Sequence, residues 1–183
     1  MKFEDYLDYF EAILKNPSAY SLYQDEEYLK YTKLNWSRMS RWLKKFEPTT
    51  QAKDFVNAIC EKQTWIVITE PWCGDAAHSV PQIFKLVEGN PNITLDIQLR
   101  DQEPLLIDKY LTNGGKSIPK LIIRNEKDED IVVWGPRPAK LQELFLKLKA
   151  EGLEFEAIKE VVQKWYNEDK GAEIQTELKA LLS

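Results

Sequence analysis

The sequence contains few of the residues that bind metal ions or cross-link a chain. Two cysteines and one histidine occur among its 183 residues. Cys60, Cys73 and His78 do not show the close ligand spacing of a zinc site, so we expect no metal and no cofactor. Because the chain also has many acidic residues and no export signal, we expect a reducing, cytoplasmic location, where structural disulfides are rare.

Long apolar runs and concentrated positive charge are also missing. No apolar stretch approaches the roughly 20 residues that span a membrane, and Met1–Asp5 lacks the apolar region of a signal peptide. The formal net charge is −5 without any basic stripe, which argues against a nucleic-acid partner. We favour a monomer, although the sequence leaves the oligomeric state open.

Residues 1–48 predict a helical N-terminal extension. Apolar side chains in its first part recur at the spacing of one helix face: Phe3, Tyr6, Leu7, Phe10, Ile13 and Leu14. We expect two further helices, one within Tyr20–Thr32 and one over Trp36–Phe46. The extension is rich in tyrosine, which fits either a ligand cradle or, as we favour, rings that pack the extension onto the main domain.

Residues 49–151 alternate between helical and strand patterns. Thr49 and Thr50 resemble a helix N-cap, and the apolar side of the following helix includes Cys60. The expected strands are Thr64–Thr69, Ile93–Leu99, Lys120–Arg124 and Ile131–Trp134, and the expected helices are Gly74–Val87, Pro104–Leu111 and Ala139–Ala150. This order predicts an α/β fold with parallel strands and one antiparallel pair. Residues 152–183 predict a helical C-terminal extension that packs on the same domain.

The most informative stretch, Trp72–Ala76, joins a predicted strand to a predicted helix. A cysteine at this junction, here Cys73, lies where unpaired backbone N–H groups and the helix dipole favour a thiolate. Pro81 follows within the helix, Ile118-Pro119 precedes a later strand, and Gly135 follows the hairpin.

This ordered set resembles the thioredoxin family, whose motif reads Trp-Cys-Gly-Pro-Cys. It looks like the bacterial members whose motif reads Trp-Cys-Gly-Asp-Ala. The resemblance covers 49–151 and implies a thioredoxin-like fold, with a central mixed sheet flanked by helices and with helical extensions at both ends. It also implies a cis peptide bond at Ile118–Pro119 and, beside Cys73, a groove in which an extended peptide or protein can bind.

The sequence departs from that family at two positions. Ala76 stands where the resolving cysteine would be, and Val67 stands where family members bury an aspartate that transfers protons to the resolving thiol. The two losses agree, because a chain without the second thiol has no use for the carboxylate. A dithiol cycle within the motif is therefore excluded.

The remaining thiol sets the functional prediction, a monothiol thiol–disulfide oxidoreductase that contributes to cell redox homeostasis. Cys73 would be the catalytic nucleophile, and an external thiol would resolve its mixed disulfide. The expected partners are protein or low-molecular-weight thiols and disulfides. The candidate substrate-binding residues are Trp72, Gly74, Asp75, Ile118 and Pro119.

Two alternatives stay open. The first is a redox-inactive thioredoxin-fold interaction module, whose helical extensions provide or cover a partner surface. The second is a dithiol enzyme in which Cys60 resolves Cys73, although we expect Cys60 to be a small core residue.

Two neighbours of Cys73 bear on its reactivity. Asp75 competes for the same N–H groups, so we expect the pKa of Cys73 to lie only modestly below that of free cysteine. His78 projects from another part of the helix, so we expect it to make a local polar contact with Asp75 rather than to act as a base.

Overall fold

The computed structural model describes residues 1–183. The helices are α1 (Phe3–Lys15), α2 (Glu26–Lys45), α3 (Thr50–Asn57), α4 (Ala76–Val87), α5 (Ala139–Ala150), α6 (Phe155–Asp169) and α7 (Ala172–Leu182). The strands are β1 (Gln63–Thr69), β2 (Ile93–Leu99), β3 (Lys120–Arg124) and β4 (Asp130–Trp134). Three short 3-10 helices complete the structure: η1 (Pro17–Ala19), η2 (Ser21–Gln24) and η3 (Leu106–Lys109).

The four strands form one mixed sheet in the order β2-β1-β3-β4. Strand β1 is parallel to β2, whereas β3 is antiparallel to both β1 and β4. Val67 lies at the centre of β1, opposite Ile97 on one side and Leu121 on the other. The predicted α/β class with a central mixed sheet is therefore confirmed, although only one strand pair is parallel.

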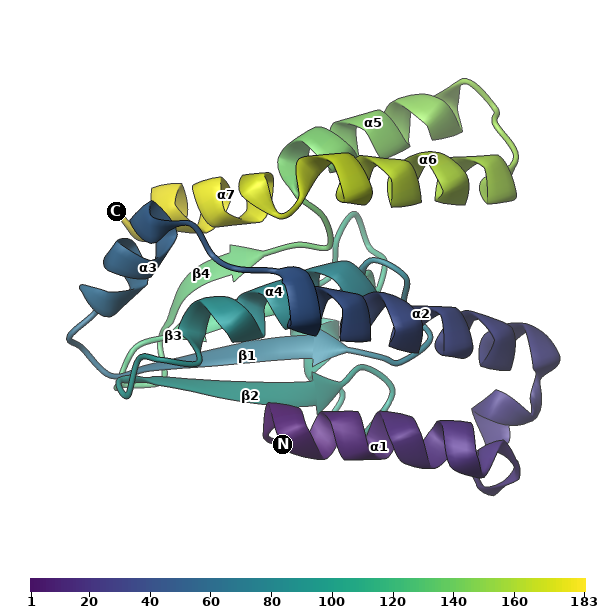
Figure 1. Ribbon diagram of the computed structural model, residues 1–183, viewed down its shortest axis with the longest axis horizontal. Helices are drawn as coiled ribbons and strands as arrows, with labels where there is room; N and C mark the ends of the chain where they lie inside the picture. Colours follow the sequence, from purple (N-terminus) through teal and green to yellow (C-terminus); the bar gives the residue numbers. More distant parts are fainter.

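Helices cover the sheet and extend beyond it. Figure 1 shows α2 lying beside α4 over the sheet, α1 near β2, and α5, α6 and α7 on the far side of α4. A single hydrophobic core includes Phe3 and Phe10 of α1 together with Ile174 and Leu178 of α7. Both ends of the chain therefore bury side chains in the same core as the sheet. None of the helices is both long and apolar enough to cross a membrane.

The N-terminal extension contains one long helix where we expected two. Helix α2 begins after Asp25, whose Oδ1 atom accepts hydrogen bonds from the backbone N–H groups of Glu27 and Tyr28 at 2.8 and 3.2 Å. No proline or glycine interrupts the next 20 residues, so the helix continues to Lys45. The segment Tyr20–Gln24, which we expected to be helical, instead leads into the cap through 3-10 turns.

Two other local predictions were wrong. Pro104–Leu111 is not an α-helix but contains only η3, because Ile107 is its one fully buried side chain and the segment has no long apolar face. Cys60 is exposed rather than part of the core. Helix α3 ends at Asn57, so Cys60 lies in the turn beyond it, where its thiol contacts the Ala58 carbonyl oxygen.

Gly135 occupies a position where a side chain does not fit. Its φ is +107°, and a Cβ built there would lie 2.4 Å from the Pro119 carbonyl oxygen. We expect Gly135→Ala to lower the free energy of unfolding by about 2–4 kcal/mol, because backbone strain and a backbone clash add together. Urea denaturation measures this change.

Two other glycines serve as matched controls. Gly152 also has a positive φ, of +76°, but no atom lies within 4 Å of its built Cβ, and Gly89 has neither the positive φ nor a close neighbour. Gly152→Ala should cost about 1 kcal/mol and Gly89→Ala less than about 0.5 kcal/mol. Equal losses for all three variants would contradict the clash at Gly135.

Candidate active site

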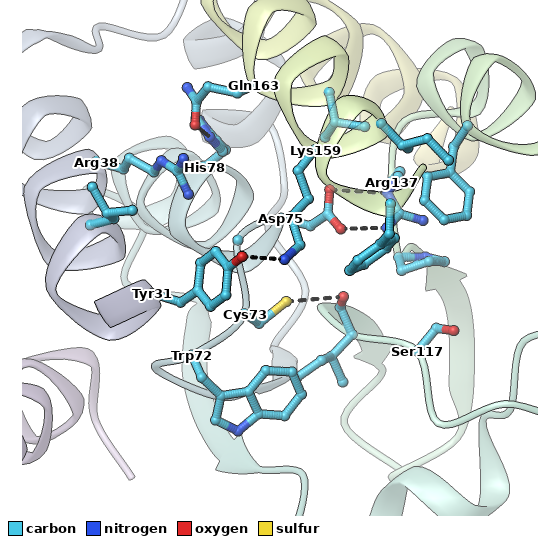
Figure 2. A pocket seen from close by; sticks show the side chains of 18 of the residues that line it. Tyr31, Arg38, Trp72, Cys73, Asp75, His78, Ser117, Arg137, Lys159 and Gln163 are labelled. Atoms are coloured by element: carbon cyan, nitrogen blue, oxygen red, sulfur yellow. Dashed lines mark hydrogen bonds and ion pairs between the residues drawn. The ribbon is translucent and has the colours of Figure 1, made fainter. Parts of the chain in front are cut away.

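A cleft of about 780 Å³ opens over Cys73. Its floor is the loop between β1 and α4 together with residues 116–118, and its walls come from α2, α5 and α6. Both helical extensions thus border the motif. Figure 2 shows Tyr31 and Arg38 on one side of the hollow and Lys159 and Arg137 on the other, with Cys73 below them.

The Cys73 thiol points across the floor of the cleft. Its Sγ atom donates a hydrogen bond of 3.3 Å to the Ile118 carbonyl oxygen, and only 7% of the residue is exposed. Trp72 lies half-buried beside it, with the guanidinium of Arg100 4.5 Å from the centre of its ring and Tyr28 packed edge-on. A thiol in this position is hydrogen-bonded and largely buried, and it faces the cleft.

Burial controls the acidity of Cys73. It raises the pKa of the thiol to about 12, and the nearby Asp75 carboxylate adds to the rise. Backbone N–H groups of Ala76 and Asp75 and the Arg137 guanidinium oppose it. The helix N-terminus therefore favours the thiolate as expected, but our prediction of a pKa slightly below that of free cysteine was wrong, because desolvation outweighs it.

Asp75 connects the motif to the C-terminal half of the chain. Arg137 binds its carboxylate through Nη2 at 2.7 Å and through Nε at 3.0 Å, and the Tyr166 hydroxyl donates to it at 3.0 Å. Burial raises the pKa of Asp75, and these two partners act against the rise. The predicted side-chain contact between Asp75 and His78 is absent, because Arg137 and Tyr166 occupy the carboxylate.

His78 is held away from the thiol by other partners. Trp42 donates from Nε1 to the Nδ1 atom of His78 at 2.8 Å, so Nε2 carries the ring proton and faces Gln163 Oε1 at 3.1 Å. The Tyr166 ring stacks on the imidazole with centroids 4.2 Å apart. Burial lowers the pKa of His78 to about 3. The ring is a neutral link between α2, α4 and α6.

The predicted substrate-binding residues do not all face the cleft. Trp72, Gly74, Asp75 and Ile118 line it, whereas Pro119 is buried behind Ile118 and does not. The Ile118–Pro119 peptide bond is cis. The Ile118 carbonyl oxygen already accepts the Cys73 hydrogen bond, so a strand bound there would share this acceptor with the thiol.

Sequence reasoning missed the residues that the extensions bring to the cleft. One stripe of α2 lines it, and the signal for this stripe was present in the spacing of Glu27, Tyr31, Leu34 and Arg38. Across the cleft, the Tyr31 hydroxyl meets both carboxylate oxygens of Glu156 at 3.0 and 3.1 Å and also contacts Lys159. The tyrosine-rich extension therefore packs on the domain with some rings and borders the cleft with others.

Cys60 precedes β1 and Cys73 follows it, so the two cysteines lie toward opposite ends of this strand. Seven strand residues span about 20 Å, whereas the Cα atoms of a disulfide are no more than about 7 Å apart. The hypothesis that Cys60 resolves Cys73 is therefore wrong. No group of three or more His, Cys, Asp or Glu side chains is placed to hold a metal ion.

A buried carboxyl that we had not predicted lies just before the motif. Glu70 is 4% exposed, its Oε1 accepts the Asp101 backbone N–H at 3.1 Å, and its own carbonyl oxygen accepts the N–H of Cys73. Burial raises the pKa of Glu70 to about 7. Its position just beyond the apolar run Trp65–Ile68 was the available signal.

Opposite pKa shifts at His78 and Glu70 predict a measurable pH dependence of stability. The folded pKa of His78 is about 3 against 6.5 in the unfolded chain, so below pH 6.5 only the unfolded state binds this proton and stability falls. The loss between about pH 7 and pH 5 is about 2 kcal/mol. Glu70 acts in the opposite sense, because its raised pKa makes the folded state bind a proton first and stability rises as pH falls through about 7.

The two contributions partly cancel in the wild type, so variants must separate them. We expect the difference in unfolding free energy between wild type and His78→Gln to shrink by about 2 kcal/mol from about pH 7 to pH 5. Glu70→Gln retains the histidine and should lose stability more steeply than wild type over that range. Urea unfolding at each pH tests this, and a wild-type minus His78→Gln difference that does not change with pH would contradict the buried, neutral imidazole.

Comparisons with known proteins agree with this architecture. The family model described as thioredoxin matches residues 21–154, well over half of the chain. A solved protein of unknown function from Pseudomonas aeruginosa is similar with a TM-score of 0.53 at 14% identity, over 76% of this chain and 86% of that one. An HIV 4E10 epitope-scaffold is similar with a TM-score of 0.58 at 13% identity, over 100% of this chain and 98% of that one.

Structural likeness at such low identity shows the fold alone. A search of curated proteins finds no match. The family match, together with the mixed sheet and its helices, is sufficient for the assignment: the chain has a thioredoxin-like fold with helical extensions and belongs to the thioredoxin family.

Proposed function

We propose that this protein is a monothiol thiol–disulfide oxidoreductase in which Cys73 forms mixed disulfides that an external thiol resolves. The observation that carries the proposal is the placement of a single thiol on the floor of a cleft, within 3.3 Å of the Ile118 carbonyl oxygen. No second cysteine can reach it, so the resolving thiol must come from outside. The reaction is an exchange of one sulfur–sulfur bond for another.

The division of the chain follows from the same proposal. Residues 49–151 would form the thioredoxin-like domain that carries the thiol, while 1–48 and 152–183 would form the walls that decide what reaches it. Trp72, Gly74, Asp75 and Ile118 would contact the substrate, and Pro119 would support the loop from behind. The motif places the chain, in this proposal, with the bacterial members that read Trp-Cys-Gly-Asp-Ala.

One observation favours the alternative of a redox-inactive binding module. Burial holds the pKa of Cys73 near 12, so at pH 7 only about one molecule in 10⁵ carries the thiolate that exchange requires. A thiol that is never deprotonated would serve only as part of a binding surface. The two functions differ in whether Cys73 exchanges with a disulfide at all.

A trapping experiment separates the two functions. We expect Cys60→Ser protein, incubated with hydroxyethyl disulfide at about pH 9, to gain one mixed disulfide at Cys73, because raising the pH increases the thiolate fraction. Intact-mass spectrometry measures the adduct, and added mercaptoethanol should remove it. The Cys60→Ser/Cys73→Ser double variant should stay unmodified. A Cys60→Ser protein that stays folded and gains no adduct would reject the oxidoreductase and leave the binding module.

The charge of Asp75 predicts a faster thiol when it is removed. The Asp75 carboxylate raises the pKa of Cys73 and Arg137 lowers it, so Asp75→Asn should lower that pKa and leave Arg137 free to act on the sulfur. In the Cys60→Ser background we expect alkylation by iodoacetamide at about pH 8 to be roughly 3- to 10-fold faster, as for a shift of half to one pKa unit.

Glu160→Gln is the matched control, because Glu160 also lines the cleft but does not contribute to the shift at Cys73. Its alkylation rate should stay within twofold of the parent. The parent rate should rise about tenfold per pH unit from about pH 7 to pH 10, since the pKa lies above that range. A rate that levels off near pH 8.5, or an Asp75→Asn variant no faster than its parent, would show that burial and Asp75 do not control the thiol.

A further inference from the structure

Arg38 is a cation in the cleft wall that lacks a carboxylate partner. Its guanidinium is half-buried, donates from Nη1 to Asn35 Oδ1 at 2.9 Å, and takes part in no ion pair. A guanidinium has five N–H donors, so most of its donors have no acceptor within the protein. Arg38 Nη1 would lie 3.7 Å from a Cβ built on Gly74, the residue that follows Cys73.

The other long cations around the cleft are already paired, with one exception. Arg137 binds Asp75, Lys159 binds Glu156, Arg100 binds Asp101 and Lys116 binds Asp108. The exception is Lys30, which is exposed and lies on the same stripe of α2 as Arg38. The two unpaired cations of the cleft are therefore both on α2, which also presents Glu27, and Arg38 is the cation that lies beside the motif, in a protein whose formal net charge is −5.

The shape of the cleft restricts the size of what can bind. Its volume of about 780 Å³ lies within the roughly 300–1,000 Å³ of small-molecule sites. Helices α2 and α6 border it on two sides, and the Tyr31 hydroxyl joins them across it through Glu156 and through Lys159 (Figure 2). With Cys73 only 7% exposed below these walls, a disulfide must enter the cleft to reach the sulfur, which favours a small molecule over the flat surface of a folded protein.

We propose that the exchange partner is a low-molecular-weight disulfide or thiol that carries a carboxylate, which Arg38 binds while the sulfur lies over Cys73. A guanidinium matches a carboxylate through two parallel hydrogen bonds. The ring of Phe155, which is 59% exposed, and the side chains of Trp72 and Leu34 give the carbon part of such a molecule an apolar surface. This inference rests on the proposed function and names its substrate class.

The chemical step is a balanced exchange. Cys73 loses its proton to solvent, and its sulfur forms a bond to one sulfur of the disulfide while the bond between the two substrate sulfurs breaks. The other half leaves as a thiolate and takes up a proton. A second carboxylate-bearing thiol then attacks the substrate sulfur of the adduct and releases Cys73. The incoming disulfide is thereby exchanged without any electron carrier other than the thiols.

A pair of chromogenic disulfides tests the inference. Dithiobis(nitrobenzoate) carries carboxylates and dithiodipyridine carries none, and each releases a coloured thiol when Cys73 reacts. In the Cys60→Ser background, Arg38→Gln should slow the reaction with dithiobis(nitrobenzoate) roughly tenfold, as for a lost charge-assisted hydrogen bond. The rate with dithiodipyridine should stay within twofold, and Arg38→Lys should fall between.

Lys33→Gln is the control for a change in overall charge, because Lys33 is an exposed cation of α2 that does not line the cleft. Its ratio of the two rates should equal that of the parent. Equal slowing of both probes by Arg38→Gln would overturn the inference, because Arg38 would then act on the thiol itself. If Arg38→Gln slows neither probe, the inference would also be overturned, while the exchange chemistry at Cys73 would stand. Failure of Cys73 to react with either probe would instead reject the proposed function and, with it, this substrate class.

Discussion

Asp75 is a largely buried carboxylate, and a buried charge is stable only when it is paired and hydrogen-bonded. Its side chain is 11% exposed, forms an ion pair with Arg137 and accepts a hydrogen bond from the Tyr166 hydroxyl. These partners come from the segment after β4 and from α6, so one charge in the motif holds the C-terminal half of the chain against the β1–α4 loop. His78 stacks on Tyr166 and accepts a hydrogen bond from Trp42 of α2, so this helix is joined to the same arrangement. The walls of the cleft depend on this network.

The same enclosure sets the chemistry of Cys73. The sulfur lies close to the start of α4, where backbone N–H groups stabilise a thiolate, but removal from water costs the charged form more. A weakly acidic thiol gives a scarce but strongly nucleophilic thiolate, since nucleophilicity rises with pKa. The hydrogen bond that the neutral thiol donates to the Ile118 carbonyl oxygen stabilises the protonated form further. Under the proposed function, such a site would react slowly until a higher pH raises the fraction of the deprotonated form.

The sequence predicted the parts of the structure that local patterns control. Strand β2, strand β3 and helix α5 have the predicted bounds, because apolar runs and helical periodicity are properties of neighbouring residues. The cleft was not predictable in this way. Tyr31 and Glu156 are 125 residues apart, and nothing in either neighbourhood indicates that they meet. The error in the pKa of Cys73 has the same origin, because the helix N-terminus is a local feature and burial by distant helices is not.

The position of Cys60 has a practical consequence for anyone handling the purified protein. This thiol is exposed in the turn after α3, at the opposite end of β1 from the cleft. Air oxidation will join two molecules through Cys60 far more readily than through the enclosed Cys73, because sulfur accessibility governs which thiol is cross-linked. A covalent dimer on a non-reducing gel therefore indicates that Cys60 was oxidised during storage. It carries no information about the state of Cys73.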